Sequence, residues 1–178
     1  MATTANNVRV GTSGAIYVGP TSATAPTGAI GSLTGFTELG YVSPDGVTET
    51  RDRSTNQIRA WQNSDLVREV VTEASATFQF VLLETNLDTL ALYYGASVDV
   101  ADGSVEVNPA ATGGRKSFVI DCIDGSSAVR TYIPIGEVLS VAETVAQNGE
   151  AVSYDITITA YASADGFSYK KFYSDLVD

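Results

Sequence analysis

Residues 66–84 alternate between apolar and polar side chains, and this pattern limits the fold more than any other in the sequence. Even positions from 70 to 82 are mostly apolar, whereas odd positions from 69 to 79 are polar except for Val71. A period of two is typical of a β-strand with one packed face and one wet face. Because such a strand would be unusually long, we expect a bulge or bend near residues 73–76.

Further strand signals place the whole chain in the mainly β class. Residues 151–161 also alternate, and an Asn148-Gly149 turn precedes them. Other strands are expected at residues 14–18, 36–42, 116–123, 129–135 and 137–145, with a turn at residues 43–46 and a C-terminal tail at residues 165–178 that includes a possible last strand. Cys122 lies in one of these strands, where we expect it to be buried. The length predicts one domain over residues 1–178.

One short helix is predicted over residues 86–94. Asn86 is a suitable N-cap, Asp88 favours the positive N-terminal end, and Gly95 occupies the C′ position. So short a helix is not stable alone and must dock on the sheet. We expect its packed stripe to consist of Leu87, Leu90, Ala91 and Tyr94.

Composition argues against catalysis. The chain has no His and one Cys, which excludes a Ser-His-Asp triad, a Cys-His pair and the usual zinc sites. None of its 21 carboxylates has a spacing that acid–base chemistry requires, so we expect no enzyme, no catalytic or metal-binding residue and no cofactor. The net charge of −11 argues against tight binding of DNA phosphates, although DNA could still pass nearby.

Nothing in the sequence indicates a membrane. There is no apolar run of about 18 residues, and the first residues lack the basic head and apolar stretch of a secretory leader. We therefore expect synthesis in a cytoplasm.

A long polar segment covers residues 44–65. It carries Arg51, Asp52, Arg53 and Arg59, followed by the single tryptophan, Trp61. A solvated hairpin of mixed charge accounts for this segment as well as a functional loop does.

Two polar strand faces are more informative, because they contain short or acidic side chains without Lys or Arg. An ordinary solvent face fits them, and so does the wall of a channel through which a polyanion slides. The residues are Glu69, Glu73, Ser75, Thr77 and Gln79 on one strand and Ser153, Asp155, Thr157 and Thr159 on the other.

Several segments, in their order along the chain, resemble a known family. They are GAIYVGP at residues 14–20, FTELGYVSPDGVT at residues 36–48, AWQ at residues 60–62, ATFQFVLLETN at residues 76–86 and LALYYG at residues 90–95. This order resembles the major tail tube proteins of long-tailed, siphovirus-type bacteriophages. The resemblance is specific over residues 14–95, whereas only the strand order agrees over residues 116–161.

The resemblance implies a β-sandwich or barrel-like subunit with a flanking helix. Six subunits would close a ring around a continuous inner β-barrel, and stacked rings would form the tail tube of the virion, assembled in the host cytoplasm. Genome ejection would use this conduit, with double-stranded DNA passing without specific binding. The implied partners are other copies of the chain, the tape measure protein, and the tail tip and tail terminator proteins, with no membrane.

The resemblance also assigns candidate surfaces. Residues 44–65, as an extended loop, and an N-terminal arm over residues 1–13 would contact the neighbouring ring. In that contact Arg51, Asp52, Arg53 and Arg59 would meet charged groups and Trp61 would be an apolar anchor. The two polar strand faces would line the lumen.

Two other functions remain open at this point. The first is the inner tube of a contractile injection machine or a type VI-like secretion system, which shares the fold. The second is a β-rich adhesin or carbohydrate-binding module.

Overall fold

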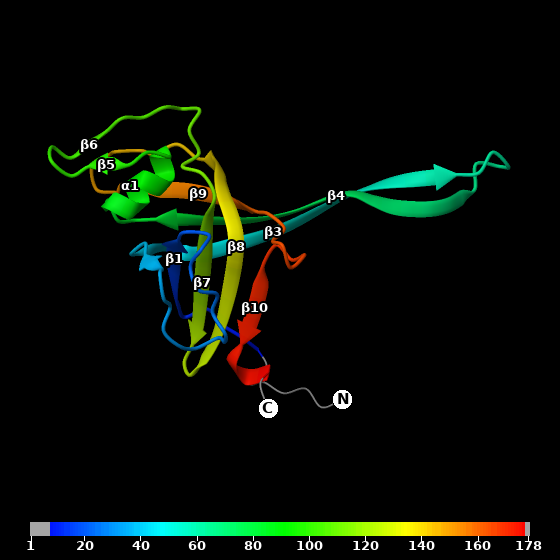
Figure 1. The fold of residues 1–178 in the computed structure, drawn as a ribbon, viewed down its shortest axis with the longest axis horizontal. Coiled ribbons are helices and arrows are strands. Elements are labelled where there is room, and N and C mark those ends of the chain that lie inside the picture. Colours follow the sequence, from blue (N-terminus) through cyan, green and yellow to red (C-terminus); the bar gives the residue numbers. More distant parts are fainter. Residues whose placement is uncertain (1–7, 177–178) are drawn as a thin grey trace.

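The computed structural model describes residues 8–176, and it is mainly β with one short α-helix (Figure 1). All strand pairs are antiparallel, and the main sheet has the order β2-β1-β7-β8-β9-β4-β3, with β10 on β8 and a separate β5–β6 pair. The elements are β1 Ser13–Gly19, β2 Thr37–Glu38, β3 Val42–Arg59, β4 Leu66–Leu82, α1 Leu87–Tyr94, β5 Val98–Asp99, β6 Ser104–Val105, β7 Lys116–Asp124, β8 Ser127–Val141, β9 Tyr154–Ala160, β10 Lys170–Tyr173 and the 3-10 helix η2 Ser174–Leu176. In residues 8–176 no helix is long and apolar enough to span a membrane.

Strand β8 joins the two halves of the sheet. Its first half pairs with β7 and β10, and its second half pairs with β9. The sequence predicted two strands here, over residues 129–135 and 137–145, and this prediction is wrong. The strand continues through Gly136, which pairs with both β7 and β9. A Cβ at this position would lie 2.8 Å from Ile158 and 2.9 Å from Phe118. The glycine lets β8 pass close to the core.

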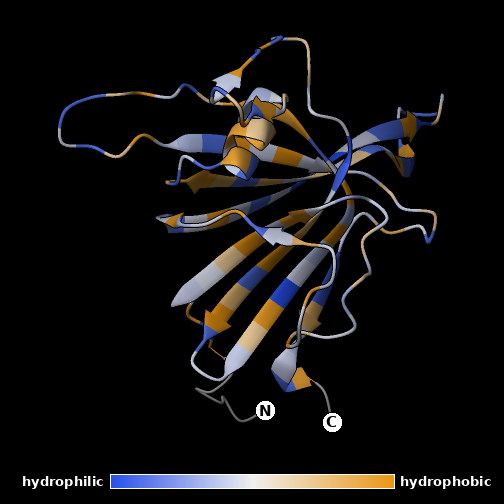
Figure 2. Ribbon diagram, turned by 60° about the vertical axis from the view of Figure 1, so that its left-hand side comes forward, coloured by the Kyte–Doolittle hydropathy of each residue, from blue (hydrophilic) through white to orange (hydrophobic). Residues whose placement is uncertain are grey.

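The core lies inside the curled sheet and forms one cluster. Its largest fully buried side chains come from five strands and the segment after β2: Ile16, Leu39, Phe78, Phe80, Leu82, Phe118, Ile133, Ile156 and Ile158. Along β9 buried and half-buried residues alternate at every position, which confirms the alternation predicted there. Figure 2 shows the resulting bands of apolar and polar residues across the strands.

Helix α1 has the predicted ends but a different packed face. The Asn86 side chain accepts a hydrogen bond from the Thr89 backbone N–H at 2.8 Å, and Gly95 has a φ of 65°. The buried residues are Thr89 and Leu92, whereas Leu87 of the predicted stripe is 54% exposed. Two hydrogen bonds to one carbonyl account for the different packed face of the helix. The side-chain amide of Asn86 and the hydroxyl of Thr89 both donate to the carbonyl oxygen of Leu39.

Residues 43–46 do not form the predicted turn. Val42 pairs with Leu82 and Val47 with Phe80, so these four residues bulge from β3, which then continues in the same direction. Gly46 has a φ of 70°, which suits glycine. A Pro-Asp-Gly sequence is therefore a bulge here rather than a chain reversal.

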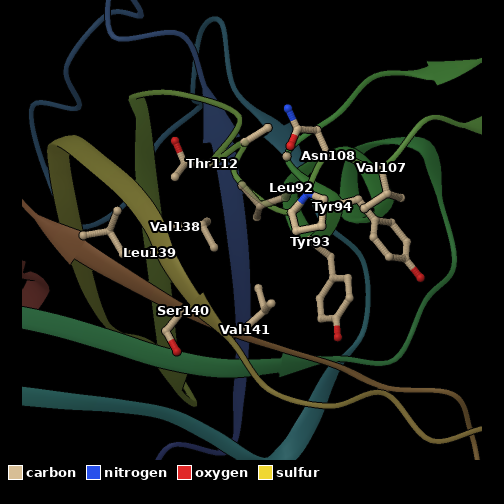
Figure 3. Close-up of a pocket in the computed structure, with 13 residues that line it drawn as sticks. Leu92, Tyr93, Tyr94, Val107, Asn108, Thr112, Val138, Leu139, Ser140 and Val141 are labelled. Atoms are coloured by element: carbon tan, nitrogen blue, oxygen red, sulfur yellow. The ribbon is translucent and has the colours of Figure 1, made fainter.

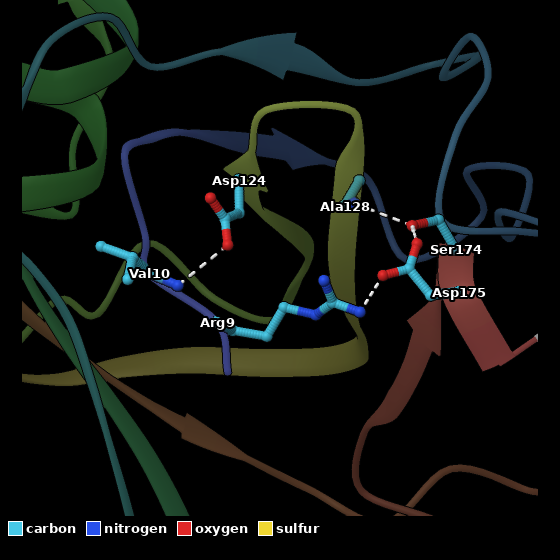
Figure 4. A network of polar contacts seen from close by, with 6 residues as sticks. All are labelled: Arg9, Val10, Asp124, Ala128, Ser174 and Asp175. Atoms are coloured by element: carbon cyan, nitrogen blue, oxygen red, sulfur yellow. Dashed lines mark hydrogen bonds and ion pairs between the residues drawn. The ribbon is translucent and has the colours of Figure 1, made fainter. Parts of the chain in front are cut away.

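The two ends of the described chain meet beside the β7–β8 turn (Figure 4). Arg9 forms an ion pair with Asp175 of η2, and the Val10 amide donates to Asp124 at 3.0 Å. The predicted last strand is present as β10. Residues 1–7 of the predicted N-terminal arm and residues 177–178 of the predicted tail lie outside the described residues.

Candidate assembly surfaces

The distal part of the β3–β4 hairpin has no packing partner among the described residues. Every residue from Thr50 to Ser75 except Ala60 is exposed, and the hairpin projects from the body of the sheet (Figure 1). Of the two interpretations left open for residues 44–65, an extended loop and a solvated hairpin, the structure has the hairpin, with β3 a strand as far as Arg59. The packed even-numbered face predicted along β4 is buried only from Ala76 onward.

The tip of the hairpin is a closed turn over residues 60–65. The Ala60 amide donates to the Asp65 carbonyl at 2.8 Å, and Arg59 donates to the Ser64 carbonyl at 3.1 Å and to Gln57 at 2.8 Å. Trp61 stands on this turn with 98% of its surface exposed. Thus Arg59 holds the turn together, while Trp61 is directed away from its own chain.

A bulge at Thr72 decides which side chains share a face of the hairpin. Ser54 pairs with Glu73, but Thr55 pairs with Val71, so Thr72 is an extra residue in β4. This confirms the expected irregularity, one residue before the predicted interval. Side chains of directly paired residues lie on the same face. Glu69 and Val71, on the tip side of the bulge, therefore lie on the opposite face of the hairpin from Glu73 and the later odd-numbered residues of β4.

The outer polar face covers four neighbouring strands on the side away from the core. Two rows cross it in register: Thr50, Thr77, Thr159 and Glu137, then Thr48, Gln79, Thr157 and Ser140. The amide of Gln79 donates to both carboxylate oxygens of Asp155, at 3.1 and 2.9 Å. Ser75 and Glu73 continue this face along the hairpin, opposite Asp52 and Ser54.

Two of the nine predicted lumen residues are placed differently. Glu69 pairs with Gln57 and accepts a hydrogen bond from Thr55 at 2.7 Å, so it lies on the other face from Glu73. The expectation of one shared face is therefore wrong for Glu69, because the bulge at Thr72 intervenes. Ser153 precedes β9 rather than belonging to it, and its carbonyl accepts a bond from Thr144 at 2.9 Å.

Two arginines lie at the margins of the outer polar face. The guanidinium of Arg115 stands 4.8 Å from the ring of Tyr161 and 4.0 Å from the carboxylate of Glu137. Arg68 pairs with Ile58 and falls on the same side near the hairpin tip. Arg51, Arg53 and Arg59 alternate with Asp52 and lie on the opposite side of β3, which we call the arginine side.

Glu49 links the base of the hairpin to the C-terminal strand. It lies 2.5 Å from Lys171, accepts a bond from the Tyr169 hydroxyl at 2.7 Å, and lies 3.6 Å from Arg51. Burial raises the pKa of Glu49, but the bonds from Lys171 and Tyr169 and the nearby positive charges outweigh it, so the pKa lies below its ordinary value. Local sequence gave no signal for this cluster, because Tyr169 is 120 residues from Glu49.

The seam groove lies where the two ends of the curled sheet approach each other. It has a volume of about 970 Å³ and is bounded by residues 11–16, residues 40–47 and residues 120–122. Four carboxylates line it, from Glu38, Asp45, Glu84 and Asp121, and none of the lining residues is Lys or Arg. Cys122 is exposed in this groove, so the prediction that it is buried is wrong.

A smaller apolar pocket of about 320 Å³ lies between α1, the segment before β7 and the end of β8 (Figure 3). Leu92, Val138 and Val141 line it, and the Tyr93 hydroxyl donates to the Ala142 carbonyl at 2.5 Å. None of its lining residues is charged. In the described part of the chain no three His, Cys, Asp or Glu side chains gather where they could hold a metal ion.

Comparison with known proteins gives one family match. The model of a family described as "Phage tail tube protein" matches residues 1–176. None of the curated proteins matches the chain.

Two solved structures are similar in part. One is titled "Virion of native gene transfer agent (GTA) particle" and has a TM-score of 0.41 and 9% identity, covering 78% of this chain and 88% of that one. The other is titled "Tail of empty GTA particle computed with helical refinement, C6 symmetry". It has a TM-score of 0.47 and 11% identity, covering 88% of this chain and 96% of that one.

Proposed function

The chain belongs to the phage tail tube protein family, whose members are structural components of virion tails, and from this premise we propose how its copies build the tube. Copies assemble into rings of six, and the rings stack into the tube of a long, non-contractile tail. The genome leaves the particle through this tube. The resemblance of residues 14–95 to siphovirus tail tube proteins supports six copies per ring and the siphovirus type.

The exposed hairpin is the observation that carries the proposal. An isolated two-stranded hairpin is marginally stable in water. This one also exposes a series of large apolar side chains: Ile58, Trp61, Leu66, Val67, Val70 and Val71. Such a segment is stabilised when another protein surface covers it, and in a homopolymer that surface belongs to a second copy. The candidates for the inter-ring contact are therefore the tip with Trp61 and the arginine side with Arg51 and Arg53.

The outer polar face supports the assignment of the lumen wall. Threonine, glutamine and carboxylate side chains cover it in two regular rows, and their short chains give a smooth surface. Negative charge repels phosphates, and hydroxyl groups offer few strong contacts to them. We therefore assign Glu73, Ser75, Thr77, Gln79, Asp155, Thr157 and Thr159 to the wall, with Ser153 at its end and Glu69 outside it.

The remaining partners belong to the same proposal. A tape measure protein occupies the bore before ejection, and tail tip and tail terminator proteins close the two ends. Each of these meets surfaces that are repeated around every ring. Double-stranded DNA then replaces the tape measure protein without a specific binding site.

Electron microscopy of tails purified from particles tests the proposal. The expected image is a hollow tube of stacked sixfold rings, with β3, β4 and β9 at the bore and no contractile sheath outside. A sheath would assign the chain to a contractile machine instead. A map that placed Thr77 and Thr157 on the outside of the tube would contradict the lumen assignment.

A further inference from the structure

The hairpin tip and the seam groove lie at opposite ends of the same strand. The groove is lined by the first residues of β3, from Val42 to Val47, whereas the tip follows Arg59, the last residue of β3. Arg59 lies twelve positions after Val47, which is about 40 Å of extended strand. A copy therefore cannot place its own tip in its own groove, but it can reach the groove of another copy.

The groove has the chemistry of a site for a basic partner. Asp121 is already neutralised, because Arg130 donates to both of its oxygens at 2.7 Å. Glu38 and Asp45 are exposed, and Glu84 accepts a bond from the Tyr41 amide. The ring of Tyr41 is 75% exposed at the groove, where it offers an aromatic face to a cation or to another ring.

The hairpin carries the complementary charge. Residues 50–75 hold four of the ten cationic residues and four carboxylates, whereas the rest of the chain holds six cations and 17 carboxylates. Arg53 and Arg68 form no ion pair within residues 8–176. Residues 50–75 thus have no net charge and include two arginines without an ion pair in residues 8–176. The rest of the chain, which the hairpin of another copy would contact, is strongly acidic.

From this juxtaposition we infer that the seam groove of one copy receives the hairpin tip of a second copy. Trp61 enters the groove against Tyr41. Arg53 on the arginine side and Arg68 on the opposite face of the hairpin then lie near Glu38 and Asp45, because the groove encloses both faces of the inserted end. The inference rests on the proposed function and adds the receiving surface to it. A contact between opposite ends of two copies is head-to-tail, and such a contact extends without closing when copies are stacked along an axis.

Cross-linking through the single cysteine tests the inference directly. Cys122 lines the groove, and Gln62→Cys adds a thiol beside Trp61 on the tip. Tails purified from particles carrying Gln62→Cys are treated with a short bis-maleimide and separated under denaturing conditions. Each copy offers one tip and one groove, so the expected result is a ladder of covalent dimers, trimers and longer chains.

Matched variants make the ladder specific. It should disappear when Cys122→Ser is combined with Gln62→Cys, because the groove thiol is then lost. It should also be absent with Ala164→Cys, an exposed position after β9 that the inference places away from the groove. Hollow tubes that give no ladder with Gln62→Cys would overturn the inference while leaving the proposed function intact. Particles in which this chain forms no tube would overturn both.

Charge reversal gives a second, independent readout. Arg53→Glu with Arg68→Glu should reduce the yield of tubes at least tenfold, because carboxylates would then face carboxylates. Adding Glu38→Lys and Asp45→Lys to that variant should restore most of the yield. Failure of the groove substitutions to restore tubes, when all variants have the same melting temperature as monomers, would contradict the assigned contact.

Discussion

Glu69 and Glu73 lie on opposite faces of the β3–β4 hairpin although both occupy odd positions of one strand. Glu73 is opposite Ser54 and continues the outer polar face, whereas Glu69 is opposite Gln57 and is bonded to Thr55. The extra residue Thr72 between them reverses the facing of the strand. The alternation of residues in the sequence therefore assigns the correct face of β4 only on one side of Thr72.

This relationship provides a matched pair for testing the lumen wall. Glu73→Lys would place a cation in the bore once per copy, and the repeated positive charges would hold DNA phosphates. We expect genome ejection to slow severalfold, and to slow less as the salt concentration rises. Ejection rates measured by dye binding to released DNA check this.

Glu69→Lys is the control for that experiment, because it makes the same charge change four residues away on the other face. We expect tubes that carry it to release DNA at the normal rate. Equal slowing by both substitutions would argue against the assignment of the outer polar face to the lumen.

Trp61 should report assembly without any label, because it is the single tryptophan of the chain and is 98% exposed. In the free subunit we expect emission typical of an indole in water and strong quenching by acrylamide. In tubes the emission should shift to shorter wavelength and the quenching should fall. An unchanged spectrum in assembled tubes would show that Trp61 is not a contact residue.

Trp61→Ala should separate assembly from folding. Because Trp61 is 98% exposed in the free subunit, the free energy of unfolding should change by less than about 0.5 kcal/mol. Loss of a buried aromatic anchor typically costs about 2 kcal/mol or more of binding free energy per contact. We therefore expect a normally folded subunit with a much higher critical concentration for tube formation, measured by sedimentation, and Trp61→Phe should be intermediate.

The buried ion pair of Arg130 and Asp121 should dominate the stability of the subunit among its charged contacts. Both side chains are almost fully buried, and Arg130 also donates to the Gly31 carbonyl at 3.1 Å, which fastens the loop before β2 to the sheet. The bond to Asp121, together with its charge, raises the pKa of Arg130 against the effect of burial.

Arg130→Met should therefore destabilise the subunit by about 3–5 kcal/mol, because it leaves the Asp121 carboxylate buried without a partner. Combining it with Asp121→Leu removes the unpaired charge and should recover part of the loss. Denaturant unfolding of the four species of this double-mutant cycle measures both effects. Equal stability of the single and double variants would show that the cost comes from lost packing rather than from the unpaired charge.

Local signals in the sequence were sufficient for some elements. The caps of α1 were predicted because Asn86 and Gly95 act through bonds and dihedral angles within one turn of the chain. The alternation of β9 was visible because one face of the strand packs into the core along its whole length. The mainly β class followed from several such segments.

Other features depend on contacts that no local pattern encodes. Two strands were predicted over residues 129–135 and 137–145, but they are one, and the glycine between them is required because Phe118 and Ile158 of other strands crowd the backbone there. Pro44 and Gly46 were assigned to a turn, yet pairing with β4 keeps β3 running in one direction through a bulge. The side that Glu69 takes depends on Thr72, whose bulge is fixed by the register between two strands.

Acid should loosen the base of the hairpin through Glu49. Its pKa lies below the ordinary value of 4.5, so its ionised form stabilises the fold at neutral pH. That contribution is fully present above about pH 4.5 and is lost as the pH falls through the lower pKa of the folded state. Glu49→Gln should thus lower stability at pH 7 by about 1 kcal/mol or less, because the contacts are partly exposed.

The difference between wild type and Glu49→Gln should shrink as the pH falls below 4.5, since protonated Glu49 no longer attracts Lys171. Thermal unfolding of the subunit across this pH range measures it. Tyr169→Phe removes one donated bond and should reproduce part of the loss at pH 7. A difference that grew on acidification would mean that Glu49 is stabilised in its protonated form, and that Lys171 and Tyr169 do not anchor β10 to the hairpin through its charge.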